Sequence, residues 1–234
     1  MLVARMVALI LAAPWLWPTS LYAQSEALME AYNRGQALYQ AGQYEQVIPY
    51  YREAFELGEQ EFGPDHPMTA NLLNNLAALN YAQGRYEAAK PLLKRALAVR
   101  EKALGPEHPD VAQSLNNLAA LYNAQGRYEA AEPLYDRALA IRERALGADH
   151  PDVANSLNNL AVLYKNQGRH EAAEPLFKRA LEVWEKALGP DHPDVATGLE
   201  NYAALLRKTG RDDEAATLEA NAKAIRAKHA EENP

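Results

Sequence analysis

The sequence predicts an all-α solenoid, built as a stack of about five helix-turn-helix units. The first observation is a direct repeat, because His150–Asp191 keeps 30 of the 42 positions of His108–Asp149. The second is a set of single residues that mark the same period: His66, His108, His150, His192, Gly84, Gly126, Gly168 and Gly210. The third is that each unit contains two helical patterns. A fixed period of this length indicates units that each pack on their neighbours.

The period divides the chain into units near 24–65, 66–107, 108–149, 150–191 and 192–234, with residues 1–23 preceding them. The two end units depart from the pattern in a polar direction. In the first unit, Arg34 stands where the middle units have leucine. In the last unit, Asp212 and Glu219 stand at the positions of the aromatic Tyr128 and Tyr135. Because a terminal unit has one face without a neighbour, we expect units 24–65 and 192–234 to act as capping units.

Residues 1–23 have the pattern of a secretory signal peptide. Arg5 precedes an apolar run from Met6 to Trp17, and Leu21-Tyr22-Ala23 offers a cleavage site. The run is shorter than the roughly 20 residues that a spanning helix needs, which favours a cleaved signal over an uncleaved anchor. We therefore expect a periplasmic or secreted protein with no membrane span in the mature chain.

The first helix of the third unit is expected from about Pro109 to Ala124. Proline suits the first helical position, and an acidic Asp110 favours the positive helix start. The apolar positions recur at spacings of three and four, which predicts one buried stripe; they are Val111, Leu115, Leu118, Ala119 and Tyr122. Gly126 is the natural left-handed stop in the turn that follows.

The second helix of the third unit is expected from about Tyr128 to Leu146, with Gly147 ending it. Pro133 lies inside this pattern and lacks a backbone donor, so we expect a slight kink or a late helix start. The predicted buried positions include alanines where helices approach closely; they are Ala131, Leu134, Tyr135, Ala138, Leu139 and Ile141.

These residues carry a family resemblance over roughly residues 25–230. The spacing of the tetratricopeptide repeat is matched by Leu115, Leu118, Ala119, Tyr122, Gly126, Tyr128, Ala131, Tyr135 and Ala138. The 42-residue length and the phrases SLNNLA, QGRYEAAEPLY and RALAIRE resemble the kinesin-light-chain type of that repeat. The resemblance implies a right-handed α-solenoid that serves as a binding scaffold, with the first helix of each pair lining a concave groove.

The candidate ligand-binding residues are asparagines of the first helices, predicted to lie off the buried stripe. An amide both donates to and accepts from a peptide backbone, and neighbouring alanines leave room for that backbone. Groove asparagines of peptide-binding family members have this role. The alternative is that one amide of each pair bonds to the neighbouring repeat and fixes the stacking. The candidates are Asn74, Asn75, Asn116, Asn117, Asn158, Asn159 and Asn201.

Three basic residues, Lys165, Arg207 and Lys208, make the late part of this predicted groove more basic than its start, where Tyr39 and Tyr81 stand. A basic groove can hold an acidic side chain or a C-terminal carboxylate. The alternative is that these residues are ordinary solvated cations.

Composition and motifs argue against several other functions. A net charge of −7 does not suit a nucleic-acid binder, which needs a basic face. No cysteine is present for disulfides or thiolate ligands. The four periodic histidines are expected to stand on the order of 10 Å apart, too far to share one zinc ion. No catalytic constellation, metal motif or cofactor loop appears, so we predict no catalytic residues, no metal and no cofactor.

The sequence therefore predicts a non-enzymatic, extracytoplasmic scaffold that binds a protein or an extended peptide. The alternative is an assembly or accessory subunit of a cell-envelope enzyme or transport complex; a hydrolase built on helical repeats is a third hypothesis. The twelve differences between the third and fourth units include four of six groove positions: Gln113, Ala120, Asn123 and Ala124. This concentration of change suggests that individual function resides on that face. The oligomeric state is left open.

Overall fold

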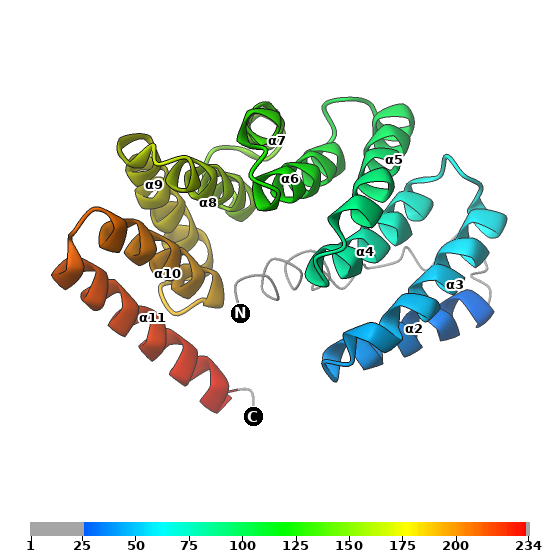
Figure 1. Ribbon diagram of the computed structural model, residues 1–234, viewed down its shortest axis with the longest axis horizontal. Helices are drawn as coiled ribbons and strands as arrows, with labels where there is room; N and C mark the ends of the chain where they lie inside the picture. Colours follow the sequence, from blue (N-terminus) through cyan, green and yellow to red (C-terminus); the bar gives the residue numbers. More distant parts are fainter. Residues whose placement is uncertain (1–25, 233–234) are drawn as a thin grey trace. The chain divides into compact units, whose positions relative to one another are not determined.

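A computed structural model describes residues 26–232, and this range folds into ten α-helices without a strand (Figure 1). The predicted signal segment, residues 1–23, lies outside the described residues. None of the described helices combines the length and apolarity that a membrane crossing needs. The helices are α2 (Glu26–Gln40), α3 (Tyr44–Phe62), α4 (Pro67–Ala82), α5 (Tyr86–Leu104), α6 (Pro109–Ala124), α7 (Tyr128–Leu146), α8 (Pro151–Asn166), α9 (His170–Leu188), α10 (Pro193–Lys208) and α11 (Asp212–Glu232).

The chain forms two compact units, which divide after Leu121, inside α6. In the first compact unit, α2 pairs with α3 and α4 pairs with α5, while α3 also packs on α4. In the second unit, α8 pairs with α9 and α10 with α11, and α7 and α9 pack on the first helix of the following pair. Each helix pair is therefore held by its own hairpin and by the hairpin beside it in the same unit.

The bounds predicted for the two helices of the third unit, Pro109–Ala124 and Tyr128–Leu146, are confirmed. A late start caused by Pro133 is wrong, because α7 begins five residues earlier and contains this proline. Proline is tolerated there because it removes a single backbone hydrogen bond from a long helix. Two leucines predicted to be buried, Leu134 and Leu139, are only half-buried.

Glycine ends both helices of the third unit in the left-handed region that other residues avoid. Gly126 has φ 70° and Gly147 has φ 88°. The Gly147 N–H donates to the Glu143 carbonyl over 3.1 Å, which satisfies one carbonyl of the last turn of α7.

The four periodic histidines cap the first helices α4, α6, α8 and α10. In each case Nδ1 accepts a hydrogen bond from the backbone N–H two residues later, at 3.2 Å for His66, 3.1 Å for His108 and His150, and 3.2 Å for His192. This role is structural, because one of the orphan N–H groups of a helix start gains an acceptor. Within residues 26–232, no three His, Asp or Glu side chains are placed to share a metal ion.

Replacing His150 by alanine is expected to lower the free energy of unfolding by about 1 kcal/mol, the usual loss for a helix cap. The matched variant is His150→Asn, which keeps a side-chain acceptor at the cap and should retain most of the stability. Urea unfolding of both variants measures the difference. Equal losses in the two variants would show that the imidazole acts through packing and not through the cap.

The first helices are more buried than the single apolar stripe predicts. Asn74 and Asn75 are each 4% exposed, and Asn116 and Asn117 are 7% and 5% exposed. Their predicted place off the buried stripe is therefore wrong. The reason is that a first helix such as α4 packs on two sides, against α3 of the preceding hairpin and α5 of its own.

Two buried arginines, which the sequence pattern alone does not single out, join successive repeats. Arg100 of α5 donates to the Ser114 hydroxyl over 2.9 Å and to the Asp110 carbonyl over 2.8 Å. Arg142 of α7 repeats these bonds with Ser156, over 2.9 Å, and with the Asp152 carbonyl. Burial lowers the pKa of both guanidinium groups, and the hydrogen bonds to the next helix compensate for the lost hydration.

At the other contacts between successive repeats, the positions equivalent to Arg142 and Ser156 carry different residue pairs. Where Arg142 faces Ser156, the next repeat places Trp184 against Gly198, and a Cβ added to Gly198 would stand 2.8 Å from the indole. In the first interface Gly58 faces Leu72, and a Cβ on Gly58 would stand 2.4 Å from that leucine. Trp184, whose place the sequence did not decide, is thus buried against the following repeat. A large residue is matched by a small one across each contact.

Candidate functional site

The first of the two compact units, which ends at Leu121, contains an open pocket between α4, α5 and α6. Its volume, including open solvent, is about 280 Å³. The wall consists of small and aromatic residues with two amides: Asn74, Ala77, Ala78, Tyr81, Leu93, Asn117 and Ala120. The predicted groove residues Asn74 and Asn117 therefore come together from two successive first helices.

Three of the four polar side-chain atoms of these amides have no hydrogen-bond partner among residues 26–232. Within the described part of the chain, neither the nitrogen nor the oxygen of the Asn74 side chain has a partner, and the Asn117 nitrogen has none either. The Asn117 oxygen accepts from Gln113 over 2.8 Å, which fixes the orientation of this amide. Because buried polar groups are nearly always paired in a protein, unpaired amides in a pocket wall point to a group supplied from outside.

Tyr81 forms the aromatic part of the pocket wall. Its ring centroid lies 5.5 Å from that of Tyr86. Burial, and secondarily Tyr86, raises the pKa of Tyr81 to about 12, so its hydroxyl stays protonated and able to donate near neutral pH.

The corresponding amides of the second unit bond to each other. The Asn201 nitrogen donates to the Asn158 oxygen over 3.0 Å, across the contact of α8 and α10. Asn158 in turn donates to Asn159 over a long 3.5 Å. In the repeat, Asn158 corresponds to Asn74 and Asn201 to Asn117. In the second compact unit, the asparagines thus bond to the neighbouring repeat, as the stacking alternative predicts. In the first compact unit, the equivalent amides of Asn74 and Asn117 do not bond to each other.

The remaining asparagines have mixed surroundings. Asn75 shares a hydrogen bond with Tyr32, whose pKa is raised mainly by burial. The Asn116 side-chain oxygen is buried and has no hydrogen-bond partner in the part of the chain that the structure describes. Neither of these two residues lines the pocket.

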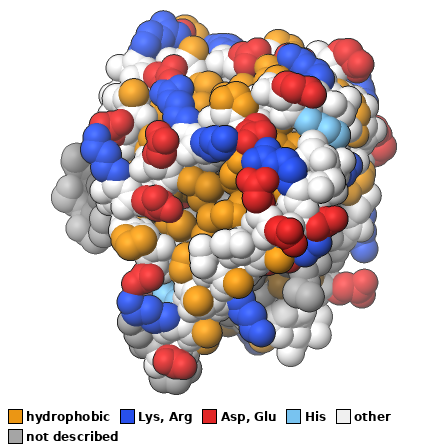
Figure 2. Space-filling model, turned by 90° about the vertical axis from the view of Figure 1, so that its left-hand side faces the viewer, with side chains coloured by type: hydrophobic (Ala, Val, Ile, Leu, Met, Phe, Trp, Pro, Cys, Tyr) orange, Lys and Arg blue, Asp and Glu red, His pale blue; other side chains and the backbone are white. Residues whose placement is uncertain are grey.

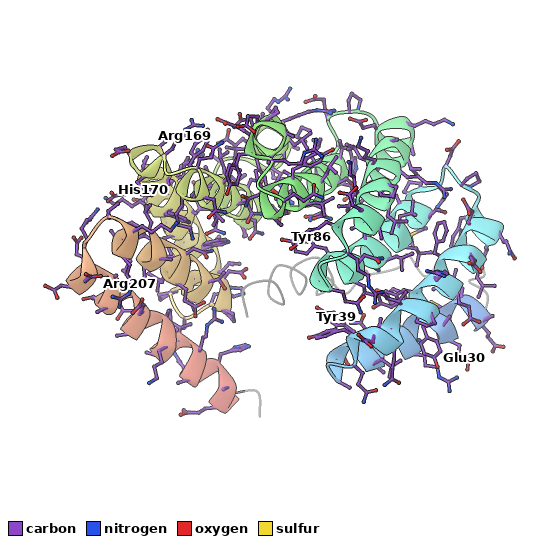
Figure 3. All side chains as sticks on the ribbon, in the orientation of Figure 1. Glu30, Tyr39, Tyr86, Arg169, His170 and Arg207 are labelled. Carbon is purple, nitrogen blue, oxygen red and sulfur yellow. The ribbon has the colours of Figure 1, made fainter. Side chains whose placement is uncertain are left out.

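The three basic candidates differ in how far they are neutralised. Arg207, labelled in Figure 3, donates to both carboxylate oxygens of Glu219, at 2.8 and 2.7 Å, and to Asp212 at 3.2 Å. Lys165 is buried and Lys208 is exposed. The structure therefore places Arg207 in an ion-pair network with α11, and the groove role of the two lysines stays a prediction.

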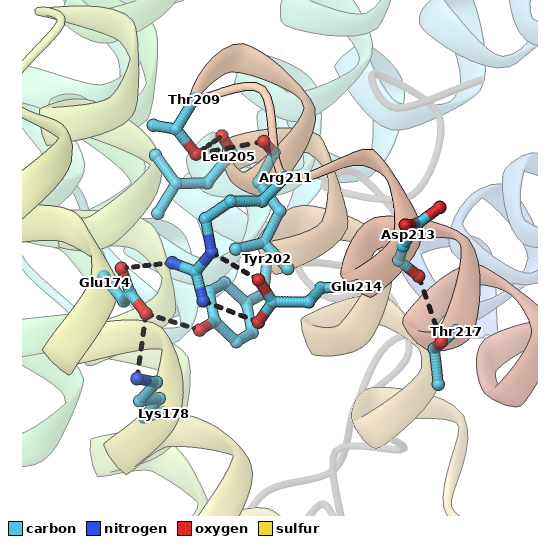
Figure 4. A network of polar contacts seen from close by, with 10 residues as sticks. Glu174, Lys178, Tyr202, Leu205, Thr209, Arg211, Asp213, Glu214 and Thr217 are labelled. Carbon is cyan, nitrogen blue, oxygen red and sulfur yellow. Dashed lines mark hydrogen bonds and ion pairs between the residues drawn. The ribbon is translucent and has the colours of Figure 1, made fainter.

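A second polar network, around Glu174, joins α9 to α10 and α11 (Figure 4). Glu174 accepts hydrogen bonds from Tyr202 at 2.7 Å and from Arg211 at 2.8 Å, and it pairs with Lys178 at 2.8 Å. These partners lower the pKa of Glu174 to about 2, with Lys178 contributing most. Figure 2 shows acidic and basic side chains interspersed over the molecular face that it draws.

Acid is expected to weaken this network. Because the pKa of Glu174 is lower in the folded protein than its ordinary value of 4.5, the carboxylate stabilises the fold above about pH 4.5. That contribution is lost as the pH falls from about 4.5 toward 2. Urea unfolding across this range should show a shallower decline for Glu174→Gln than for the unaltered protein. Parallel curves would contradict the assignment.

Comparisons with known proteins agree with the repeat architecture. The tetratricopeptide-repeat family model matches residues 27–102, 72–143, 110–182 and 152–228. A crystal structure of nearly identical TPR-like repeats from a Podosopora anserina putative kinesin light chain has 25% identity and TM-score 0.70, covering 90% of this chain and 100% of that chain. BtubC (BKLC) from P. vanneervenii has 24% identity and TM-score 0.71, with coverages of 99% and 91%.

One further solved structure is a Rap protein complexed with Competence and Sporulation Factor. It has 18% identity and TM-score 0.74, and the match covers 88% of this chain and 56% of that chain. No curated protein sequence matches this chain significantly. Because the matches to the family model together cover residues 27–228, the chain belongs to the tetratricopeptide-repeat family, with repeats of the kinesin-light-chain-like type.

Proposed function

We propose that this protein is a non-enzymatic, extracytoplasmic scaffold that binds an extended peptide segment of a partner protein. The observation that carries the proposal is the pair of buried, unpaired amides, Asn74 and Asn117, in the wall of one pocket. Tetratricopeptide repeats generally serve as non-enzymatic binding scaffolds, which supports the same class of function. The pocket wall includes no carboxylate, so it offers nothing to the hydrolase hypothesis.

The exposed wall of the pocket is almost wholly apolar, and the buried amides of Asn74 and Asn117 behind it offer the donors and acceptors that a peptide backbone needs. The free amide of Asn74 supplies one acceptor and two donors, and Asn117 supplies two donors, so a peptide carbonyl and N–H both find partners. The small side chains of Ala77, Ala78 and Ala120 let a backbone approach closely. The unpaired atoms are covered by the pocket wall, so binding requires a side-chain rotation there, a common change at interfaces.

The experiment is a selection of phage-displayed random dodecapeptides on the purified protein, followed by calorimetric titration of the selected peptides. The double variant Asn74→Leu, Asn117→Leu removes the unpaired amides and should weaken binding by about tenfold or more, as expected when buried hydrogen bonds to a ligand are lost. Asn158→Leu is the matched control, because that amide is already used inside the protein. Peptides that bind the double variant as tightly as the unaltered protein would overturn the pocket assignment.

The extracytoplasmic part of the proposal rests on residues 1–23, and it has a separate test. Intact-mass measurement of the protein from an envelope extract should give a chain that begins at Gln24. A chain that keeps residues 1–23 and fractionates with the cytoplasm would overturn this part alone.

A further inference from the structure

Four tyrosines flank the turns of the first two hairpins. Tyr39 lies in the last turn of α2 and Tyr44 begins α3, with ring centroids 5.2 Å apart. Tyr81 lies in the last turn of α4 and Tyr86 begins α5, with ring centroids 5.5 Å apart. Because the two pairs stand 42 residues apart in the sequence, an aromatic contact is made at the same repeat position twice in succession. We call these four residues the tyrosine ladder.

Paired tyrosines at this position are confined to the first two hairpins. The later repeats have at most one tyrosine there, although all of them keep the turn glycine in its left-handed conformation. The ring pairs are therefore a feature of this surface and not a requirement of the turn. The residues at the two positions in the later repeats are Asn123 with Tyr128, Lys165 with His170, and Arg207 with Asp212.

The two ring pairs lie on neighbouring hairpins of the first compact unit. The side chain of Gln83, beside the second turn, donates to the carbonyl of Tyr44 over 3.2 Å and so links the two turns. Figure 3 shows Tyr39 and Tyr86 at the same end of their hairpins. The tyrosine ladder therefore crosses from one hairpin to the next at their turn ends.

The tyrosine ladder continues the wall of the pocket. Tyr81 belongs to both, and it is only 7% exposed. Tyr39 and Tyr86 are half-buried, and Tyr44 is 36% exposed, more than any other large apolar side chain of residues 26–232. A peptide held at the pocket amides therefore meets aromatic rings where it leaves the pocket.

The tyrosine ladder offers flat apolar faces and hydroxyl donors. Burial raises the pKa of Tyr39 and of Tyr81 to about 12, and the neighbouring tyrosine adds to this effect in each pair. These two hydroxyls therefore stay protonated and can donate near neutral pH. A polyproline II helix has the complementary surface. Its proline rings pack on aromatic side chains, and its carbonyls remain acceptors because the backbone makes no internal hydrogen bonds.

The spacing of the ring pairs also matches a polyproline II helix. Packed neighbouring helices have axes roughly 8–10 Å apart, and a hydrogen bond between Tyr32 and Asn75 joins α2 directly to α4. Equivalent side chains of these two helices are therefore on the order of 10 Å apart. One turn of a polyproline II helix takes three residues and rises about 9 Å. Prolines three residues apart thus meet successive ring pairs.

We propose that the tyrosine ladder binds a proline-rich segment of the peptide ligand, in the polyproline II conformation and with prolines three residues apart. One proline packs on Tyr39 and Tyr44, and the next packs on Tyr81 and Tyr86. This inference rests on the proposed function, and it adds the chemical class of the ligand. The low conformational freedom of such a segment reduces the ordering cost of binding.

The dodecapeptides selected on the unaltered protein supply the first test. They should be enriched in two prolines separated by two other residues. Replacing either proline by alanine should weaken binding by about threefold or more, because alanine gives up both the fixed backbone angle and the ring contact. Moving the second proline by one position, with the composition unchanged, should weaken binding as much as losing it. An affinity that survives this shift would contradict the match between the helix turn and the ring pairs.

Tyr44→Ala and Tyr86→Ala should each weaken binding of a selected peptide by about tenfold, a loss typical of a tyrosine that anchors an interface. Tyr44→Phe and Tyr86→Phe keep the rings and should lose less. The matched control is Tyr128→Ala, because Tyr128 stands at the same position of the third repeat, which has Asn123 in place of the second tyrosine. This control should leave the affinity unchanged, and a loss equal to the other two would contradict the role of paired rings. Thermal unfolding checks that each variant is folded.

The outcomes separate this inference from the proposed function. Selected peptides that depend on Asn74 and Asn117 but show no preference for proline would overturn the inference alone. Failure to select any peptide would contradict the proposed function, and this inference with it. Because aromatic rings also stack on sugars, chitohexaose is titrated against the same variants. Chitohexaose binding that Tyr44→Ala and Tyr86→Ala abolish, without a proline preference among the peptides, would assign the tyrosine ladder to a glycan and overturn the proline-rich ligand.

Discussion

Replacing Trp184 by alanine is expected to lower the free energy of unfolding by about 3–5 kcal/mol, the range for removal of a large buried aromatic side chain. Trp184 is 2% exposed and belongs to a core cluster that spans α8 to α11 and includes Phe177. It fills the space that Gly198 leaves in the following repeat, so its removal opens a cavity between two hairpins.

Guanidinium unfolding measures this loss, and Trp184→Phe is the comparison. The indole nitrogen makes no hydrogen bond to any residue of 26–232, so phenylalanine loses volume but no polar contact there and should cost less than alanine. A loss below about 1 kcal/mol for Trp184→Ala, the level of an exposed position, would contradict its role as the filler of this interface.

Replacing Gly198 by serine is expected to destabilise the protein by about 1–3 kcal/mol, although serine has the higher helix propensity. The added Cβ would stand 2.8 Å from both the Leu181 side chain and the indole of Trp184, and neither can move away without disturbing the core. Thermal unfolding measures the effect. An increase in stability, as propensity alone would give, would contradict the packing at this contact.

The double variant Trp184→Arg, Gly198→Ser should recover part of the stability that Gly198→Ser alone loses. It recreates the pair of the preceding repeat, in which Arg142 donates to Ser156 and to the Asp152 carbonyl. Asp194 stands at the position that corresponds to Asp152, so the backbone acceptor is in place. We expect a favourable coupling of about 1–3 kcal/mol between the two substitutions in a double-mutant cycle. A coupling near zero would contradict an energetic link between the two positions.

The sequence predicts the helices well because their determinants are local. Pro109 stands where the structure starts a helix, and Gly126 and Gly147 follow the ends of helices. The spacing of the histidines predicts a structural role, but their capping of helix starts became visible only with the Nδ1 contacts.

The contacts between repeats were less accessible from the sequence. From the sequence, Arg142 has the pattern of a solvated cation on an amphipathic helix. The one indication of a buried partner is that the next repeat changes both positions together, with Trp184 in place of Arg142 and Gly198 in place of Ser156. Asn74 and Asn158 stand in the same phrase of the repeat, yet one amide is unpaired and the other is bonded. That difference depends on the exact approach of the neighbouring helix, which a repeated sequence phrase does not encode.

The most direct test of the account compares Asn74→Leu with Asn158→Leu in urea unfolding without ligand. Asn74→Leu should leave the free energy of unfolding unchanged or raise it by about 1 kcal/mol, because it removes a buried amide that has no partner. Asn158→Leu should lower it by about 1–3 kcal/mol, because the Asn201 nitrogen then loses its acceptor. Equal losses for both variants would show that Asn74 serves the fold, and they would contradict the assignment of its amide to a ligand.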